Sequence, residues 1–217
     1  IWMTTNAVTQ GFRTCQSNLG VKIHDAKDPG QHLGPMFRQV IWTLFSLMEN
    51  YEEHWKNVRG SEPLEIFGFE GSIEPESVKV DLESMIERFK VGFQQFSSLW
   101  KDIFCETCFK EIQKAAAMDA KKFVFPTDSW VRILYELAAT FHAWKVNRLK
   151  LIELVTPLYY ARVASFVKQS MKMSSHEAEQ LVEEQAVKFE KHKDYLIEVW
   201  DKKSKEKKKR KRWRSKD

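Results

Sequence analysis

A histidine, two aspartates and a lysine lie close together in the sequence, at His24, Asp25, Lys27 and Asp28. Apolar residues alternate with other residues over 19–23, which predicts a short half-buried strand that ends at the histidine. The Gly and Pro residues that follow indicate an irregular loop. An imidazole and carboxylates at a strand end can hold a divalent metal, and a lysine beside them can hold a phosphate. The alternative is a solvated loop in which an Asp caps the next helix.

Cys105 and Cys108 form a Cys-x-x-Cys pair at the predicted start of a helix. The positive end of a helix dipole favours a thiolate there, so a redox pair is one interpretation. A metal site would need a second Cys or His pair at suitable spacing, and the sequence shows none.

Arg162 lies on a mostly apolar, aromatic helix face (159–166), so its charge must find an anion. An ion pair between helices is the structural interpretation, and a contact with substrate is the alternative. His142, His176 and His192 fall on predicted helices without ligand-like neighbours. We expect these histidines to be structural or solvated.

The composition is that of a helical protein with a substantial core. Aromatic residues make up 13% of the 217 residues, so most of the chain has enough apolar surface to fold. Eight Gly and six Pro, beside 30% charged residues, favour helices over a turn-rich β fold. Three Cys make no disulfide framework. The sequence has no signal peptide and no apolar run of membrane-spanning length, so a cytoplasmic protein is expected.

The net charge of +5 hides an uneven distribution. Residues 202–217 contain eleven Lys or Arg and two acidic residues, which leaves a net charge of −4 on residues 1–201. A run of like charges repels itself, so this basic segment is expected to be a disordered tail or a frayed helix extension that does not pack. It can attract nucleic acid or anionic lipid, but a solubilising role is preferred and a nucleic-acid partner is not expected.

Apolar residues spaced by threes and fours predict helices along most of the chain. The predicted helices cover residues 2–13, 37–58, 75–104, 106–118, a segment that starts at Pro126, 149–172, and a last helix from Ser174 to about Trp200. A strand is predicted over 15–23, before the loop that ends near Pro35. Residues 60–75 are predicted to be a linker that Phe67 and Phe69 anchor.

Three local signals refine these helices. Pro75 suits a first helical turn, and Pro157 is expected to interrupt or restart the helix in which it lies. Ser174 and Glu177 have the spacing of a capping box.

Six sequence blocks resemble one known enzyme group. The blocks are Ile-Trp-Met-Thr-Thr-Asn-Ala at 1–7, Gly-Phe-Arg-Thr-Cys-Gln at 11–16, Lys-Ile-His-Asp-Ala-Lys-Asp-Pro-Gly at 22–30, His-Leu-Gly-Pro-Met-Phe-Arg-Gln at 32–39, Arg-Gly-Ser-Glu-Pro at 59–63 and Thr-Pro-Leu-Tyr-Tyr-Ala-Arg-Val-Ala-Ser-Phe-Val at 156–167. They resemble the carboxy-terminal half of nucleotide-sugar glycosyltransferases of the glucosylglycerate/mannosylglycerate synthase type, which are related to glucosyl-3-phosphoglycerate synthases. The resemblance extends to about Trp200.

The resemblance implies a mainly α fold, a helical bundle appended to a helix–strand–loop remnant of an α/β, GT-A-like domain. Residues 1–36 would end that α/β domain, residues 37–201 would form the helical carboxy-terminal domain, and residues 202–217 the basic disordered tail. The nucleotide-binding half, with its Asp-x-Asp motif, would precede residue 1, and no such motif occurs in the sequence. The chain is therefore expected to be inactive alone.

The resemblance also implies roles for individual residues. His24 would be a ligand of the divalent metal, Mg²⁺ or Mn²⁺, that bridges the diphosphate of the sugar nucleotide. Lys27 would neutralise a diphosphate oxygen, and Asp25 and Asp28 would orient His24 or bind sugar hydroxyls. A solvated loop charge is the alternative for each of these three residues. Related enzymes that use phosphoglycerate carry a basic residue and an amide after this histidine. Asp25 and Ala26 stand there instead, which favours plain glycerate.

Met3, Thr4 and Thr5 occupy the place that corresponds to the acceptor side, with helix capping as the alternative for the hydroxyls. The expected reaction is transfer of a hexose from a nucleotide sugar to glycerate or a related small hydroxy acid, with retention at the anomeric carbon. No catalytic base is assigned, and a homodimer is expected. Two rival functions remain open: a non-catalytic helical module for self-association, and a nucleic-acid-associated protein that acts through the basic segment.

Overall fold

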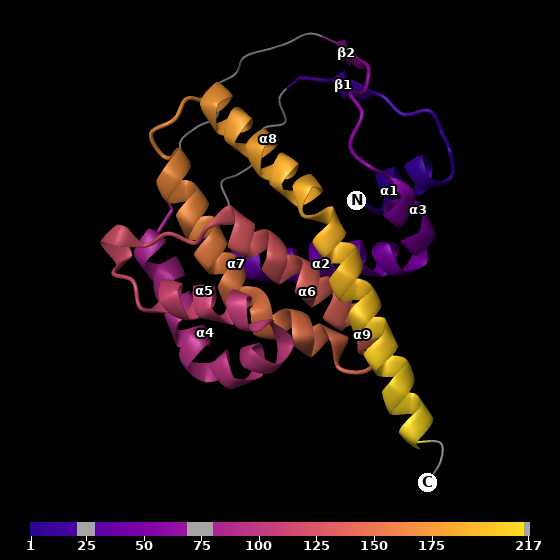
Figure 1. The fold of residues 1–217 in the computed structure, drawn as a ribbon. Coiled ribbons are helices and arrows are strands. Elements are labelled where there is room, and N and C mark those ends of the chain that lie inside the picture. The colour runs from indigo at the N-terminus through magenta and orange to yellow at the C-terminus, as the bar shows by residue number, and fades with distance from the viewer. Residues whose placement is uncertain (21–28, 69–79, 215–217) are drawn as a thin grey trace.

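The computed structural model of the protein describes residues 1–20, 29–68 and 80–214. Its elements are α1 (Trp2–Thr9), β1 (Gln16–Asn18), α2 (Pro29–Asn50), α3 (Glu52–Asn57), β2 (Ile66–Gly68), α4 (Leu82–Ile103), α5 (Glu106–Ala116), the 3₁₀ turn η1 (Ala120–Lys122), α6 (Thr127–Ala143), α7 (Arg148–Ser170), α8 (Ser175–Lys191) and α9 (Lys193–Arg214). The predicted mainly α class is confirmed (Figure 1). Among the described helices, none has the length and apolar character needed to cross a membrane.

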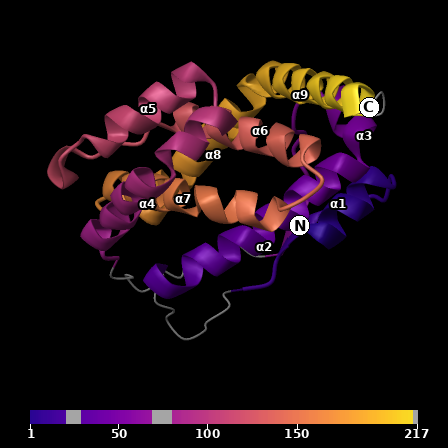
Figure 2. The same cartoon turned by 90° about the horizontal axis from the view of Figure 1, so that it is seen from below.

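Helix α7 lies inside the bundle and packs against both α4 and α2, while α6 packs against α9 (Figure 2). The apolar stripe of α7 is almost fully buried at Leu151, Ile152 and Leu158. Large aromatic side chains fill the same core, and Trp100 of α4 and Trp200 of α9 are both fully buried. The helical spacing of the apolar residues thus places one continuous core between helices that are far apart in sequence.

Two predicted helices are each divided in the structure. The helix expected over 37–58 starts earlier, at Pro29, and divides at Tyr51 into α2 and α3, because Tyr51 leaves the helical conformation. The last helix is likewise divided at His192, which separates α8 from α9. The apolar pattern continues across both breaks, so spacing alone could not locate them.

Side-chain caps decide where α4 and α8 begin. Asp81 caps α4 by accepting a hydrogen bond from the backbone N–H of Ser84 at 2.9 Å, so this helix starts later than predicted. Pro75, the predicted start, lies outside the described residues. The predicted capping box at α8 is confirmed, since Ser174 and Glu177 satisfy each other's backbone N–H groups.

Pro157 does not interrupt its helix as expected, because α7 continues through it. The proline ring lies against Gly92 of α4, where an added Cβ would come within 2.4 Å of the Pro157 Cβ. A glycine at this crossing allows α4 to approach the proline face of α7 closely.

A small parallel sheet lies apart from the helical bundle (Figure 1). β1 pairs with β2 in the register Gln16 to Ile66 and Asn18 to Gly68. Only the start of the strand predicted over 15–23 is strand among the described residues, and β2 was not predicted at all. The expected anchoring of the linker by Phe67 is wrong, because this side chain is 54% exposed. Phe69 lies outside the described residues.

Helix α9 continues into the basic segment as far as Arg214, which agrees with the helical alternative for that segment. The start of the basic segment, at Lys203, packs against the core, whereas the sequence predicted a segment that does not pack. The ammonium of Lys203 donates hydrogen bonds to the carbonyl of Ile103 at 2.9 Å and to Oγ1 of Thr140 at 2.8 Å. The long aliphatic stem of a lysine permits this partial burial while its charge finds oxygen partners.

Candidate functional site

The predicted metal and donor residues His24, Asp25 and Lys27 lie outside the described residues. The segment that carries them follows β1 and precedes α2 in the chain. The metal and phosphate roles of these residues therefore stay predictions. The structure describes the elements on either side of them, β1 and α2.

The predicted acceptor-side residues lie on α1. Met3 is 78% exposed, Thr4 is exposed and Thr5 is half-buried. Helix capping does not explain the two hydroxyls, because Ile1 is the N-cap of α1 and makes no side-chain capping bond. Because Met3 and Thr4 are exposed, both side chains are accessible to a ligand.

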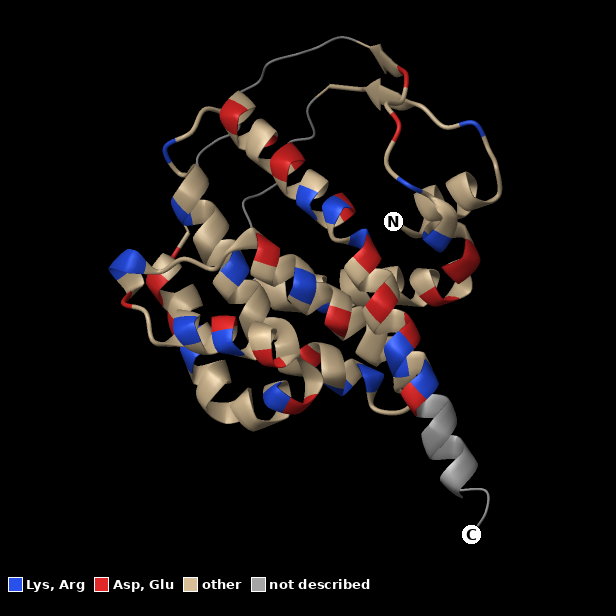
Figure 3. Cartoon of the chain, in the orientation of Figure 1, with Lys and Arg blue, Asp and Glu red and all other residues tan. Residues whose placement is uncertain are grey.

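The elements α1, β1 and β2 share an uncharged and exposed character that sets them apart from the other elements. They contain no charged residue and no buried residue, and Figure 3 shows them almost without the red and blue of the other helices. Several large apolar side chains in this region are more than half exposed. They are Ile1, Trp2, Met3, Phe12, Leu19, Ile66 and Phe67. We call these seven residues the N-terminal apolar surface. Concentrations of exposed apolar side chains are typical of surfaces that contact another domain or protein.

Arg162 is almost fully buried between α7, α8 and the start of α6. Its guanidinium donates to the carbonyl of Phe125 at 3.2 Å, to Oγ1 of Thr127 at 3.0 Å and to Oε1 of Gln185. Burial lowers the pKa of Arg162. The predicted interhelical role is consistent with these contacts, but within the described chain the partners are neutral oxygens and not the expected anion. Nothing in this arrangement leaves the guanidinium pointing toward a ligand.

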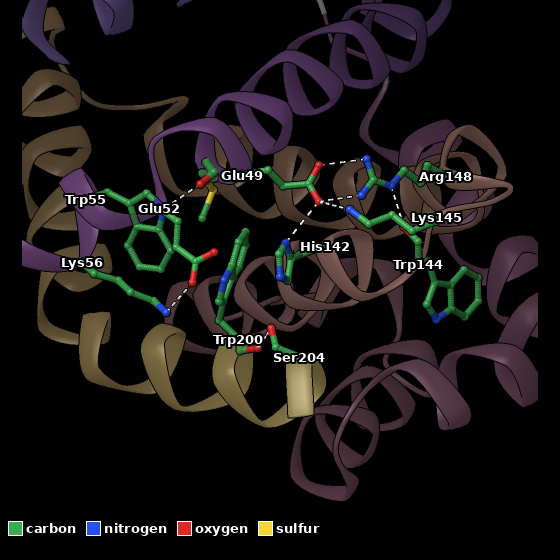
Figure 4. A network of polar contacts seen from close by, with 11 residues as sticks. Glu49, Glu52, Trp55, Lys56, His142, Trp144, Lys145, Arg148, Trp200 and Ser204 are labelled. Carbon is green, nitrogen blue, oxygen red and sulfur yellow. Dashed lines mark hydrogen bonds and ion pairs between the residues drawn. The ribbon is translucent and has the colours of Figure 1, made fainter. Parts of the chain in front are cut away.

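A second polar network joins α2, α6 and α7 around Glu49 (Figure 4). The carboxylate of Glu49 accepts two hydrogen bonds from Arg148, at 2.6 and 2.9 Å, and one from Lys145 at 3.0 Å. Its Oε1 is also 3.1 Å from Nδ1 of His142. The imidazole of His142 stacks on Trp200, which connects α9 to the same network.

The electrostatics of this network favour a neutral histidine beside an ionised glutamate. Burial lowers the pKa of His142, although Glu49 and Glu52 favour its charged form. Burial raises the pKa of Glu49, but Arg148 and Lys145 outweigh burial, and its pKa lies below the ordinary value. Arg148 binds Glu49 with two hydrogen bonds, and no nucleophile lies beside them among the described contacts. The network therefore has a structural role, in which it connects α2, α6 and α7.

Within the described residues, a group of potential metal ligands lies where α5 begins against α6. Cys105 is the N-cap of α5 and is exposed, whereas Cys108, one turn later, is buried. The structure adds the buried carboxylate of Glu136 from α6, and its oxygen lies within 4.8 Å of both sulfur atoms. The hydroxyl of Tyr195 from α9 donates a hydrogen bond to Oε1 of Glu136. Burial and then the charge of Glu136 raise the pKa of the Cys108 thiol.

The sequence interpretation of the Cys-x-x-Cys pair missed Glu136 because it considered only Cys and His as further ligands. A signal was present, since Glu136 is spaced by three from Ile133 and by four from Thr140 on the buried face of α6. A carboxylate on such a face needs polar partners, and residues that approach it are candidates for a site.

Comparisons of the chain with protein-family models, with curated proteins and with solved structures gave no match.

Proposed function

We propose that this chain is the carboxy-terminal part of a retaining, metal-dependent glycosyltransferase of the glucosylglycerate/mannosylglycerate synthase type. The enzyme would transfer a hexose from a nucleotide sugar to glycerate or a related small hydroxy acid. The six sequence blocks support the class of enzyme. The observation that carries the proposal in the structure is the exposed parallel pair of β1 and β2, which contributes Ile66 and Phe67 to the N-terminal apolar surface.

Parallel strands occur almost only in sheets that helices cover on both faces, and a two-stranded sheet is marginal in water. All six residues of β1 and β2 are exposed. A short parallel pair with uncharged, exposed residues is therefore what we expect at the boundary of a larger α/β domain. In the proposed enzyme, the occupant of this surface is its own nucleotide-binding domain.

In the proposed enzyme, the residues between β1 and α2 would belong to the donor site. His24 would serve as a metal ligand, with Lys27 at the diphosphate and Asp25 orienting the imidazole or binding sugar hydroxyls. A divalent Mg²⁺ or Mn²⁺ supplies Lewis-acid stabilisation of the departing nucleoside diphosphate. Asp25 would repel a phosphorylated acceptor, which favours plain glycerate. Exposed Met3 and Thr4, with Thr5, would line the acceptor side.

The test uses the longer natural polypeptide with a panel of nucleotide sugars, Mn²⁺ and glycerate. His24→Ala is expected to weaken Mn²⁺ binding in calorimetry and to reduce turnover at least about a hundredfold, as expected for loss of a group that stabilises the transition state. The control is His54→Ala, an exposed histidine of α3. Equal activity of the two variants, or an upstream sequence without an Asp-x-Asp motif, contradicts the proposal.

Self-association is the second candidate, because the N-terminal apolar surface also fits a second copy of the chain. In this case the longer polypeptide binds no nucleotide sugar, and Trp2→Ser together with Phe67→Ser converts a dimer into a monomer in light scattering. Persistence of the dimer in that double variant contradicts the alternative.

A further inference from the structure

We propose that Cys105, Cys108 and Glu136 form a binding site for a thiophilic divalent cation of the zinc type. Their donor atoms, two sulfurs and a carboxylate oxygen, all lie within 4.8 Å of one another. The sulfurs come from the first turn of α5 and the oxygen from the buried face of α6, so two packed helices hold the group together.

The start of α5 arranges the two sulfur atoms. Cys105 is the N-cap, and its Sγ accepts a hydrogen bond from the backbone N–H of Cys108 at 3.4 Å. Side chains three residues apart lie on one side of a helix, so the two sulfurs face the same space. The N-terminus of a helix also stabilises negative charge on ligands placed there.

The spacing of the donors is close to what a tetrahedral zinc centre requires. With Zn–S and Zn–O bonds of usual length, the edges of the tetrahedron are about 3.5 to 3.8 Å long. Sγ of Cys108 and Oε1 of Glu136 are 3.8 Å apart. The other pairs lie within 4.8 Å, so they need to close by at most about 1.3 Å, a distance of the size that side-chain rotation can supply.

The second shell fixes the carboxylate and balances the charge. Glu136 is 3% exposed, and its Oε2 accepts the backbone N–H of Cys105 at 2.6 Å. The ammonium of Lys203 donates a hydrogen bond to Oγ1 of Thr140, one turn along α6. Burial lowers the pKa of Lys203, and the charge of Glu136 acts against this shift. Two thiolates and a carboxylate are compensated by a divalent cation together with this lysine.

The exposed side of Cys105 is where a fourth ligand can approach the cation. The hydroxyl of Tyr195, already bonded to Glu136, lies 3.8 Å from Sγ of Cys105. Because Cys105 is exposed, either this hydroxyl or a water molecule can complete the tetrahedron. Sulfur donors select zinc-like cations over Mg²⁺ and Mn²⁺, so this site is separate from the metal of the proposed sugar transfer.

A redox role for the same cysteines is the competing interpretation. A disulfide pair needs two sulfurs only, whereas here a third donor, held by hydrogen bonds from α5 and α9, converges on both. This convergence is the reason for preferring the cation.

The experiment titrates the reduced full chain with Co²⁺, which reports thiolate ligands through a sulfur-to-cobalt charge-transfer band, followed by displacement with Zn²⁺. We expect one equivalent of Co²⁺ to bind. Cys105→Ser should abolish the charge-transfer contribution of that ligand and weaken affinity at least about tenfold, since loss of supporting residues alone costs that much in metal sites. Serine is a favoured N-cap, so this variant should keep the fold. Cys15→Ser removes an exposed cysteine outside the group and should bind as the parent does.

Cys108→Ser and Glu136→Gln should weaken binding in the same assay, with circular dichroism to verify that each variant is folded. Absence of a charge-transfer band at millimolar Co²⁺ overturns the proposal. Equal affinity of the parent and Cys105→Ser overturns it as well. So does a reduced chain that binds no cation while mass spectrometry shows a Cys105–Cys108 disulfide forming in air, because that result identifies a redox pair.

Discussion

The imidazole of His142 stacks face to face on the indole of Trp200, with ring centroids 4.2 Å apart and an angle of 18° between the planes. This contact joins α6 to α9, and Nδ1 of the same imidazole reaches Glu49 of α2. One histidine thus connects three helices, and its protonation state should affect how well they hold together.

Stability should fall as the pH is lowered through the range in which His142 titrates. Burial lowers its pKa below the ordinary 6.5, so below about pH 6.5 the unfolded chain binds a proton that the folded chain resists. The stability that depends on a neutral His142 is fully present above pH 6.5. It is lost as the pH falls from 6.5 toward the pKa of His142 in the folded chain. Urea unfolding of the parent at pH 8 and pH 5.5 should show the difference. His142→Gln cannot titrate, so its stability should differ less between pH 8 and pH 5.5 than that of the parent. An equal difference in the parent and the variant would assign the effect to other groups. The lowered pKa of Glu49 acts in a separate, more acidic range below 4.5.

Arg148 and Lys145 should contribute unequally to the free energy of unfolding, although both donate hydrogen bonds to Glu49. The side chain of Arg148 is 16% exposed and makes two bonds, whereas that of Lys145 is 55% exposed and makes one. Arg148→Ala should reduce the free energy of unfolding by about 2–4 kcal/mol, because it leaves a partly buried carboxylate short of its main partner. Lys145→Ala should cost less than about 1 kcal/mol, as is usual for exposed pairs. Similar losses in the two variants, measured by chemical denaturation, would contradict this ranking.

Gly92 should not tolerate even a methyl group. Its Cβ would overlap Pro157, and both residues belong to packed helices that cannot easily separate. Gly92→Ala should destabilise by at least about 1–3 kcal/mol, the usual cost of overpacking. Gly60, around which no atom lies within 4 Å of an added Cβ, provides the control. Thermal unfolding should show a lower midpoint for Gly92→Ala and little change for Gly60→Ala.

Arg162 should be important for stability and not for substrate affinity. Arg162→Ala removes hydrogen bonds to the carbonyl of Phe125 and to Thr127, and the loss should be about 1–3 kcal/mol. If the proposed glycosyltransferase is correct, the midpoint of thermal unfolding of that enzyme should fall while its KM for the nucleotide sugar stays the same. An increase in KM without loss of stability would assign Arg162 to the substrate site.

The sequence predicted elements better than their limits or their tertiary partners. The helix start predicted at Pro126 and the capping box of Ser174 are local signals. Pro126 is the N-cap of α6, and the capping box is present. The break at Tyr51 was missed because the apolar spacing runs through it. The continuity of α7 at Pro157 depends on Gly92 of another helix, which no local pattern reveals.

The candidate sites show the same difference between local and tertiary information. The spacing of Cys105 and Cys108 was visible in the sequence, but Glu136 joins them only through the packing of α5 on α6. β2 was missed because a three-residue strand in a Gly- and Pro-containing stretch has no alternating pattern of its own. Its partner β1 lies about fifty residues earlier in the chain, so the pairing could not be inferred locally.

In the described chain, β1 and β2 each use one edge for pairing, so each leaves a row of backbone N–H and C=O groups on its outer edge. Such an edge is a template on which an extended segment of another molecule can align through backbone hydrogen bonds alone. These unpaired backbone groups are therefore a hazard of aggregation at high protein concentration. The shortness of the strands limits this hazard, and a charged residue introduced on the edge, such as Ser17→Lys, should reduce it further.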